Sequence, residues 1–229
     1  MRILLAAAVI PPLYLLYVIY RMDKIEKEPA SLILKLFVIG CVVVVPAALI
    51  ESYVIEGLAM VVRPATIPFL LIENFLCVAL VEELVKYLGL KLGSWRNPAF
   101  NYCFDGVIYA VTVSLGFAAA ENIGYVASYG ISVAVTRALT AIPGHCIFGI
   151  FMGYYYGMAK YAASHGDKGR ASTYRVLAVV MPMIIHGFYD FCASSGYDIL
   201  IMVFFAYIII LDIYAIRAVK RYARNDTEI

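Results

Sequence analysis

Seven long apolar stretches follow one another along the chain, with short polar connections between them. They cover residues 3–20, 31–54, 67–90, 103–127, 134–160, 175–194 and 197–216. A helix that crosses the hydrocarbon core of a bilayer needs about 20 consecutive, mainly apolar residues. Lipid cannot satisfy backbone polar groups, so these stretches are expected to be helices. The sequence therefore predicts an all-α, polytopic membrane helix bundle of about seven transmembrane helices.

The composition agrees with this fold class. Of the 229 residues, 64% are hydrophobic and 15% are charged, whereas soluble domains have about 45–50% apolar and about 25% charged residues. One membrane domain over residues 1–229 uses the whole length and leaves no room for a soluble domain of ordinary size. Within it we expect a cytoplasmic loop at 160–175 and a basic cytoplasmic tail at 217–229. The five cysteines are scattered singly, which indicates neither a disulfide framework nor a thiolate metal site.

Basic residues are distributed unequally between the two sides of the predicted bundle. Thirteen Lys and Arg residues lie in the odd-numbered connections and the tail, and three lie on the opposite side: Arg2, Arg63 and Arg137. Cytoplasmic connections of membrane proteins carry the excess of Lys and Arg. We therefore expect an external N-terminus and a cytoplasmic C-terminus, with the lipid bilayer as a partner and no nucleic acid.

Two adjacent glutamates, Glu82 and Glu83, interrupt the third apolar stretch. A charged side chain at the bilayer centre costs at least about 2.5–3.5 kcal/mol, so an intramembrane ionisable pair indicates a functional site. Lys86 follows at helical spacing and can meet either carboxylate. One glutamate can then stay ionised while its neighbour takes a different protonation state, which suits general acid–base catalysis. The alternative is a salt bridge that only anchors packing.

The next three apolar stretches each carry polar residues as well. Glu121 and Asn122 lie in the fourth stretch and His145 in the fifth, while His186 and Asp190 are one helical turn apart in the sixth. A carboxylate one turn from a histidine can orient its ring. Each residue alone is a weak signal, but the set predicts that helices three to six enclose one polar cavity.

Small residues at four-residue spacing accompany these polar groups. One stripe comprises Gly116, Ala120, Gly124 and Ser128, and another comprises Gly149, Gly153 and Gly157. Such stripes let neighbouring membrane helices approach closely. We expect them to turn the adjacent polar side chains towards the interior of the bundle.

The histidines are expected to meet the glutamates in a cavity that opens to the outer half of the bilayer. At about 1.5 Å per residue, Glu82 lies deeper than the histidines if its helix starts at Thr66. The depths agree only if the span begins near Ile72. Pro68 is therefore expected to bend the helix or to end a re-entrant piece.

Six segments, in chain order, resemble the motifs of a known family. They are Arg-Met-Asp-Lys-Ile-Glu-Lys-Glu-Pro at 21–29, Val-Glu-Glu-Leu-Val-Lys at 81–86, Phe-Asp-Gly-Val-Ile-Tyr at 104–109, Leu-Gly-Phe-Ala-Ala-Ala-Glu-Asn at 115–122, Pro-Gly-His at 143–145 and His-Gly-Phe-Tyr-Asp at 186–190. On these segments the chain resembles the PrsW family of intramembrane proteases, within or near the CAAX-type membrane endopeptidases. The first segment departs from the family pattern, because Lys27 stands near the place of a second proline.

The resemblance implies an endopeptidase of the bacterial plasma membrane that cuts a single-pass membrane protein. The typical substrate is an anti-sigma factor, cut on its extracytoplasmic side. That cut is the site-1 cleavage of regulated intramembrane proteolysis, after which a second protease releases the sigma factor. The family is described as metalloproteases, whereas the related CAAX endopeptidases look like metal-free glutamate proteases.

A metal-free mechanism and a zinc mechanism both fit the polar residues. In the first, a glutamate activates water, a histidine stabilises the oxyanion, and Asn122 or Asp190 orients the partners. The expected catalytic residues are Glu82, Glu83, Glu121, His145 and His186, supported by Lys86, Asn122 and Asp190.

The zinc mechanism would use an open site with water as the fourth ligand. Its protein ligands would be His145, His186 and one of Glu82, Glu83 or Glu121. The HExxH signature is absent, and the Lys86 ammonium would compete with a divalent ion. The metal-free mechanism, with no cofactor, is therefore favoured, and zinc is the alternative.

Two other classes of function remain open from the residues. Ionisable groups on facing helices also suit an ion- or proton-coupled transporter, although the internal repeats and matched broken helices of such folds are not visible. A non-catalytic scaffold could bind single-pass partners through the glycine stripes.

Overall fold

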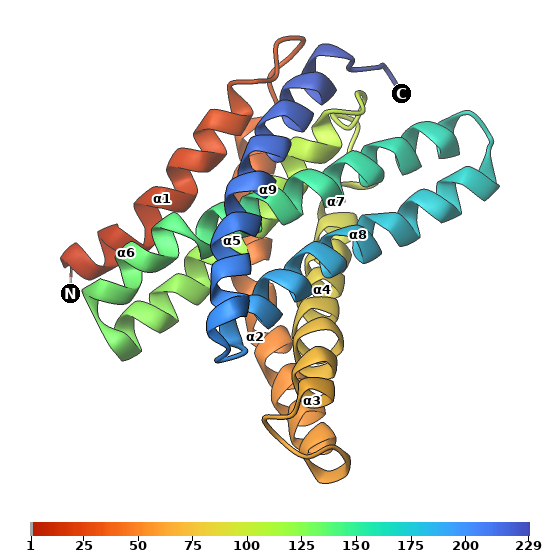
Figure 1. Cartoon of the computed structure of the whole chain (residues 1–229). Coiled ribbons are helices and arrows are strands. Elements are labelled where there is room, and N and C mark those ends of the chain that lie inside the picture. Colours follow the sequence, from red (N-terminus) through yellow and green to blue (C-terminus); the bar gives the residue numbers. More distant parts are fainter. Residues whose placement is uncertain (1) are drawn as a thin grey trace.

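The chain folds into a bundle of helices, shown as a computed structural model in Figure 1, which describes the backbone of residues 2–229 and the side chains of residues 5–229. The elements are α1 (Arg2–Tyr20), α2 (Ala30–Val61), α3 (Ile67–Ile72), the π-helix η1 (Glu73–Ala79), α4 (Leu80–Ser94), α5 (Asp105–Tyr129), α6 (Ile131–Leu139), α7 (Ala141–Ser164), α8 (Lys168–Ser194) and α9 (Asp198–Arg224). The described residues form no strand, and their only β-type pairing is an isolated bridge between Tyr102 and Glu228. The predicted all-α membrane helix bundle is confirmed.

Each predicted apolar stretch coincides with a helical segment. The third stretch is a continuous run of α3, η1 and α4, and the fifth comprises α6 and α7. Five segments are long and apolar enough to cross a membrane, namely α2, α5, the α6–α7 run, α8 and α9. The apolar part of α1, Leu5–Tyr20, is shorter, and the third segment carries the charged residues of the site.

The segments at 160–175 and 217–229, expected as a cytoplasmic loop and a basic cytoplasmic tail, are mostly helical, and their cytoplasmic position stays a prediction. Only 165–167 separate α7 from α8, and α9 continues to Arg224. Asp167 caps α8, since its carboxylate accepts a hydrogen bond from the backbone N–H of Arg170 at 2.9 Å. Polar residues mark where a helix leaves the apolar layer, but lysine, arginine and alanine continue the helix beyond it.

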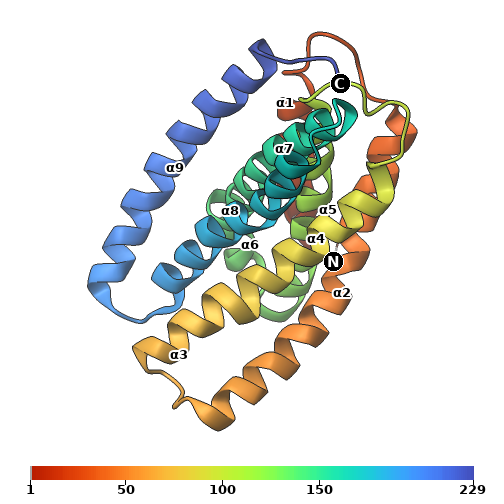
Figure 2. The ribbon, with the colours of Figure 1, turned by 90° about the vertical axis from the view of Figure 1, so that its right-hand side faces the viewer.

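Helix α5 lies at the centre of the bundle, and every residue from Asp105 to Ala119 is buried. It packs against α7 on one side and against α2 on another. Helices α7 and α8 lie between α9 on one side and α2, α3 and α4 on the other (Figure 2). At the α5–α7 contact, a Cβ added to Gly153 would lie 2.4 Å from the carbonyl oxygen of Gly106. The glycine stripe of α7 therefore makes backbone contact with α5, as predicted.

The helix that carries the glutamates begins at Ile67 and continues without a break to Ser94. The bend expected at Pro68 is absent, because Pro68 lies in the first helical turn, where its missing N–H costs no hydrogen bond. The irregularity is instead the π-helix η1. The difference in depth between glutamates and histidines is explained by the α2–α3 hairpin, which projects beyond the other helices at its end of the bundle (Figures 1 and 2).

Candidate active site

The π-helix η1 packs directly against α8 just before the glutamates begin α4. Gly187 permits this approach, because a Cβ added to it would lie 2.6 Å from the ring of Phe75 in η1. A π-turn shifts the residues that follow around the helix axis, and such turns are frequent at functional sites. The packing of η1 on α8 places Glu83 beside His186, the residue that precedes Gly187.

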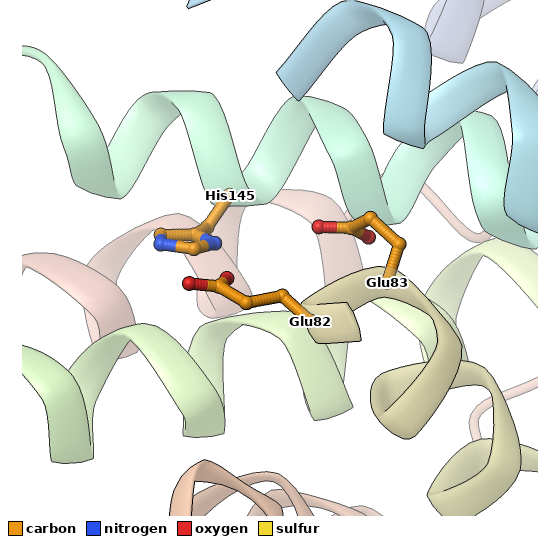
Figure 3. Close-up of side chains that lie close together, drawn as sticks. All are labelled: Glu82, Glu83 and His145. Atoms are coloured by element: carbon orange, nitrogen blue, oxygen red, sulfur yellow. The ribbon is translucent and has the colours of Figure 1, made fainter. Parts of the chain in front are cut away.

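The ammonium group of Lys86 is the hub of the site. Its Nζ donates hydrogen bonds to Glu82 Oε2 and to Glu83 Oε1, each at 2.8 Å, and to His145 Nδ1 at 3.2 Å. Figure 3 shows both carboxylates extending from α4 towards His145 on α7. Lys86 is 0% exposed and lies over the ring of Phe117 at 4.2 Å. The predicted ion pair is thus present, with both glutamates as partners.

His145 is fixed on both sides of its ring. Because an ammonium group is only a donor, Nδ1 must accept from Lys86, and Nε2 then carries the proton. Nε2 donates to Glu121 Oε2 at 3.1 Å, and the same oxygen accepts from Arg137 Nη2 at 2.6 Å. Ser114 donates to the backbone carbonyl of His145 at 2.6 Å. The chain Lys86–His145–Glu121–Arg137 therefore links four helices.

His186 lies between two carboxylates. Its Nδ1 is 3.0 Å from Glu83 Oε1 and its Nε2 is 3.0 Å from Asp190 Oδ2. Only a doubly protonated ring donates to both oxygens at once. The ring also stacks on Phe148 with centroids 4.5 Å apart. Asp190 orients His186, as its spacing along the helix predicted.

Asn122 binds Arg137 and α1 and does not contact the two glutamates of α4 through a hydrogen bond. Its Nδ2 donates to the carbonyl oxygen of Ala8 on α1 at 3.1 Å, and its Oδ1 accepts from Arg137 Nε at 3.1 Å. Asn122 therefore positions Arg137, which in turn holds Glu121, and it makes no direct hydrogen bond to Glu82 or Glu83.

A cavity of about 440 Å³ lies beside these residues, and its lining includes side chains of α6 and of the last turn of α8. Glu82, both histidines and Glu121 line it, whereas Glu83 and Lys86 lie behind its wall. The polar lining is completed by Glu51, Asn74, Arg137, Thr140, Asp190 and Ser194. The structure thus brings all five expected catalytic residues together, and it gives the two glutamates different access to the cavity.

Arg137, Glu51 and Asn74 line the cavity, although none of them was assigned to the site from the sequence. From the sequence, Arg137 was considered only as a basic residue on the outer side of the bundle. Glu51 lies within the apolar run of α2, and its Oε1 is buried without a hydrogen-bond partner among the described side chains. A carboxylate within an apolar run is a functional signal in its own right, and that signal could have identified Glu51.

The hydrogen bonds of these side chains decide whether the site suits a metal ion. Glu82, Glu83 and His145 each offer one ligand atom, and the three atoms lie within 4.8 Å of one another. The Nζ of Lys86 is within hydrogen-bond distance of all three residues. Zinc needs ligands with free lone pairs at about 2.0–2.2 Å, and Lys86 already uses the lone pair of His145. In this arrangement the three side chains bind the ammonium group of Lys86, and they do not fit a zinc ion.

Comparisons with known proteins give one consistent result. The family model described as PrsW family intramembrane metalloprotease matches residues 28–215. Protease PrsW of Oceanobacillus iheyensis is 34% identical over 222 residues, which cover 97% of each chain. Protease PrsW of Clostridioides difficile is 31% identical over 97% of this chain and 92% of its own, and that of Bacillus subtilis is 30% identical over 84% and 83%. No solved structure is significantly similar to the chain.

Proposed function

Since the chain belongs to the PrsW family of intramembrane proteases, we propose that it hydrolyses a peptide bond of a single-pass membrane protein with Glu82 as the base and without a metal ion. Membership in a protease family sets aside the transporter and the scaffold. The observation that carries the mechanism is the contrast between the two glutamates. Both bind Lys86, but only Glu82 lines the cavity.

Glu82 is arranged as a general base. The Lys86 ammonium binds its Oε2, while Oε1 makes no hydrogen bond within the described residues. Glu82 takes a proton from a cavity water as the water oxygen attacks the carbonyl carbon of the scissile bond. The carbon–nitrogen bond then breaks, and Glu82 returns the proton to the leaving amine. A positioned acid–base group of this kind contributes about 10²–10⁴-fold to a rate.

His186 is the group we assign to the oxyanion. Its ring lines the cavity and lies between Glu83 and Asp190, which hold it in the protonated form. A fixed positive charge in a water-poor site stabilises the negative charge that develops on the carbonyl oxygen. Glu83 has no access to the cavity, so its proposed role is to position Lys86 and His186 through a single oxygen atom.

Zinc catalysis is the second candidate, because the family description contains the word metalloprotease. It would require Lys86 to leave its three partners and at least one histidine to exchange its present partner for the ion. The observed hydrogen bonds support the metal-free mechanism, in which Lys86 supplies the local positive charge.

We further propose that the substrate belongs to the class of anti-sigma factors and is cut on its extracytoplasmic side. Residues of α6 and of the end of α8 line the cavity. The distribution of basic residues supports an external position for that end of the bundle. The site would therefore meet a spanning substrate in the outer half of the bilayer.

The test is cleavage of candidate single-pass membrane proteins by the purified protein in detergent. Glu82→Gln is expected to lower the rate about 10²–10⁴-fold, and Glu83→Gln at least about tenfold, while both variants still accumulate in the membrane. Glu56→Gln is the matched control, since Glu56 is an exposed glutamate on α2. Normal cleavage by both site variants would place the catalytic site elsewhere.

A further inference from the structure

A second polar cluster lies at the end of the bundle away from the catalytic cavity. Three segments meet there: the α1–α2 connection, the α4–α5 connection and the C-terminal residues 225–229 (Figures 1 and 2). Backbone hydrogen bonds join Cys103 to Thr227 at 2.9 Å and Ile229 to Asn101 at 2.7 Å. Asp105 begins α5 at this end, and about 24 Å of helix separates it from Glu121. The cluster is therefore distinct from the proposed catalytic site.

Three buried carboxylates form the centre of this cluster. Asp23, Glu28 and Asp105 are 4%, 3% and 1% exposed, and each offers one oxygen atom within 4.8 Å of the others. No lysine or arginine side chain among residues 5–229 lies within ion-pair distance of them. Buried carboxylates are retained at low cost only when a cation or sufficient hydrogen bonds compensate them. The cluster therefore has no direct ion-pair partner of the kind that Lys86 and Arg137 provide at the catalytic site.

Lys27 is close in sequence but does not supply that charge directly. Its Nζ donates to the backbone carbonyl oxygens of Tyr20, at 3.0 Å, and of Asp23. It thus binds the backbone of the connection rather than a carboxylate of the cluster.

Hydrogen bonds from the protein leave the cluster incompletely satisfied. Asp105 Oδ2 accepts from the backbone N–H groups of Asn101 and Tyr102 at 3.0 and 2.7 Å. Glu28 Oε2 accepts from the hydroxyl of Tyr109, whereas Glu28 Oε1 is buried and has no partner among the described residues. The side-chain oxygen of Asn101 is likewise buried and unpartnered. Each such oxygen loses its hydration without compensation.

We propose that Asp23, Glu28 and Asp105 bind a hard divalent cation, Mg²⁺ or Ca²⁺, which ties the α1–α2 connection to the start of α5. All donors are oxygen atoms, and the nitrogen and sulfur ligands that select zinc or copper are absent from the described cluster. Oxygens that share an ion at about 2.1 Å for Mg²⁺ or about 2.4 Å for Ca²⁺ lie at most about 4–5 Å apart. That limit agrees with the observed spacing, and the charge of the ion offsets the three carboxylates.

The competing explanation is that the carboxyl groups share protons. Burial is the largest cause that raises the pKa of Glu28, which lies in the connection outside the membrane spans. A protonated Glu28 could donate to Asp105 without any ion. The two explanations differ in their response to added cation, since a proton-shared cluster is indifferent to Mg²⁺ and Ca²⁺ at fixed pH.

The experiment uses the purified full-length protein in detergent, freed of divalent ions by a chelator that is then removed. MgCl₂ and CaCl₂ are titrated separately by calorimetry, and thermal unfolding is followed in parallel. We expect saturable binding of close to one ion per chain. At a concentration about a hundredfold above Kd, the unfolding equilibrium constant should fall about a hundredfold. The ion with the lower Kd identifies the preferred occupant.

Two variants assign the binding to this cluster. Glu28→Gln should abolish the heat of binding and the ion-dependent stabilisation. Glu26→Gln, which changes an exposed glutamate of the same connection, should retain both. Wild-type protein that neither binds nor is stabilised by either ion up to about 10 mM, tenfold above the weakest protein calcium sites, would overturn the proposal. Unchanged binding in Glu28→Gln would overturn it too, and the wild-type titration decides even if that variant does not fold.

Discussion

The crossing of α2 and α5 provides a sharp test of the packing around the site. A Cβ added to Gly116 of α5 would lie 2.2 Å from the carbonyl oxygen of Phe37, and one added to Gly40 of α2 would lie 2.1 Å from that of Val113. Ordinary contact begins at 3.4 Å, so a single methyl group must separate the helices by about 1 Å. Gly124, two turns further along α5, has no atom within 4 Å of its Cβ position.

These distances give a magnitude for Gly116→Ala. Overpacking a tight contact costs about 1–3 kcal/mol, and more where backbone atoms must move. Alanine in place of glycine within a helix gains up to about 1 kcal/mol, and Gly124→Ala should receive that gain without the clash. Both variants receive the propensity gain, so it cancels in the comparison. We therefore expect the two variants to differ by the clash alone, about 1–3 kcal/mol, which is a ratio of about five to 150 in the unfolding equilibrium constant.

The assay is reversible unfolding of the purified variants in detergent by added dodecyl sulfate. Trp95, the single tryptophan, packs edge-on against Tyr156 with centroids 5.3 Å apart, and its fluorescence reports the loss of that contact. Gly116→Ala should unfold at lower denaturant than wild type, and Gly124→Ala at equal or higher denaturant. If Gly116→Ala matched Gly124→Ala, the close approach of α2 to α5 would be refuted, together with the interior position it gives to Glu121.

Three further results are expected. Lys86→Met leaves two buried carboxylates without their cation and should destabilise the protein by about 3–5 kcal/mol. The control is Lys35→Met, which changes an exposed lysine without a carboxylate partner. Equal stability of the two variants would contradict the role of Lys86. Cleavage should survive strong chelation, since the base is held by Lys86; loss of activity with phenanthroline, its recovery with added zinc and about one bound zinc per chain would establish the zinc mechanism instead. A reporter fused after Glu228 should be active only in the cytoplasm, and activity solely outside the cell would reverse the orientation.

The sequence alone determined the helical architecture and the local pairs within the site. The length of the apolar stretches is enough to predict the helices, because in lipid the backbone can form hydrogen bonds only within its own helix. The contact of Glu82 with Lys86 and that of His186 with Asp190 are both one turn apart on a helix, so spacing predicts them before any packing is known. The set of polar residues on four consecutive apolar stretches further predicted that the helices carrying these pairs enclose one cavity.

Packing between helices decided the remaining features. Arg137 meets Glu121, and Asn122 turns to Arg137 and α1, because of where α1 and α6 lie beside α5. The two glutamates are equivalent in sequence, yet only Glu82 lines the cavity. That difference follows from the orientation of α4, which depends on how η1 packs on Gly187.

The cluster of Asp23, Glu28 and Asp105 is likewise a product of helix packing and could not be predicted from the sequence. Asp23 and Glu28 follow α1, Asp105 opens α5, and nothing in their spacing places them together. They meet because α1 ends, and α2 and α5 begin, at the same side of the bundle, where the C-terminal residues fold back onto the connection before α5. Periodicity along a chain specifies which face of a helix a residue occupies, whereas its neighbour across the bundle depends on the relative positions of whole helices, which only the packed structure determines.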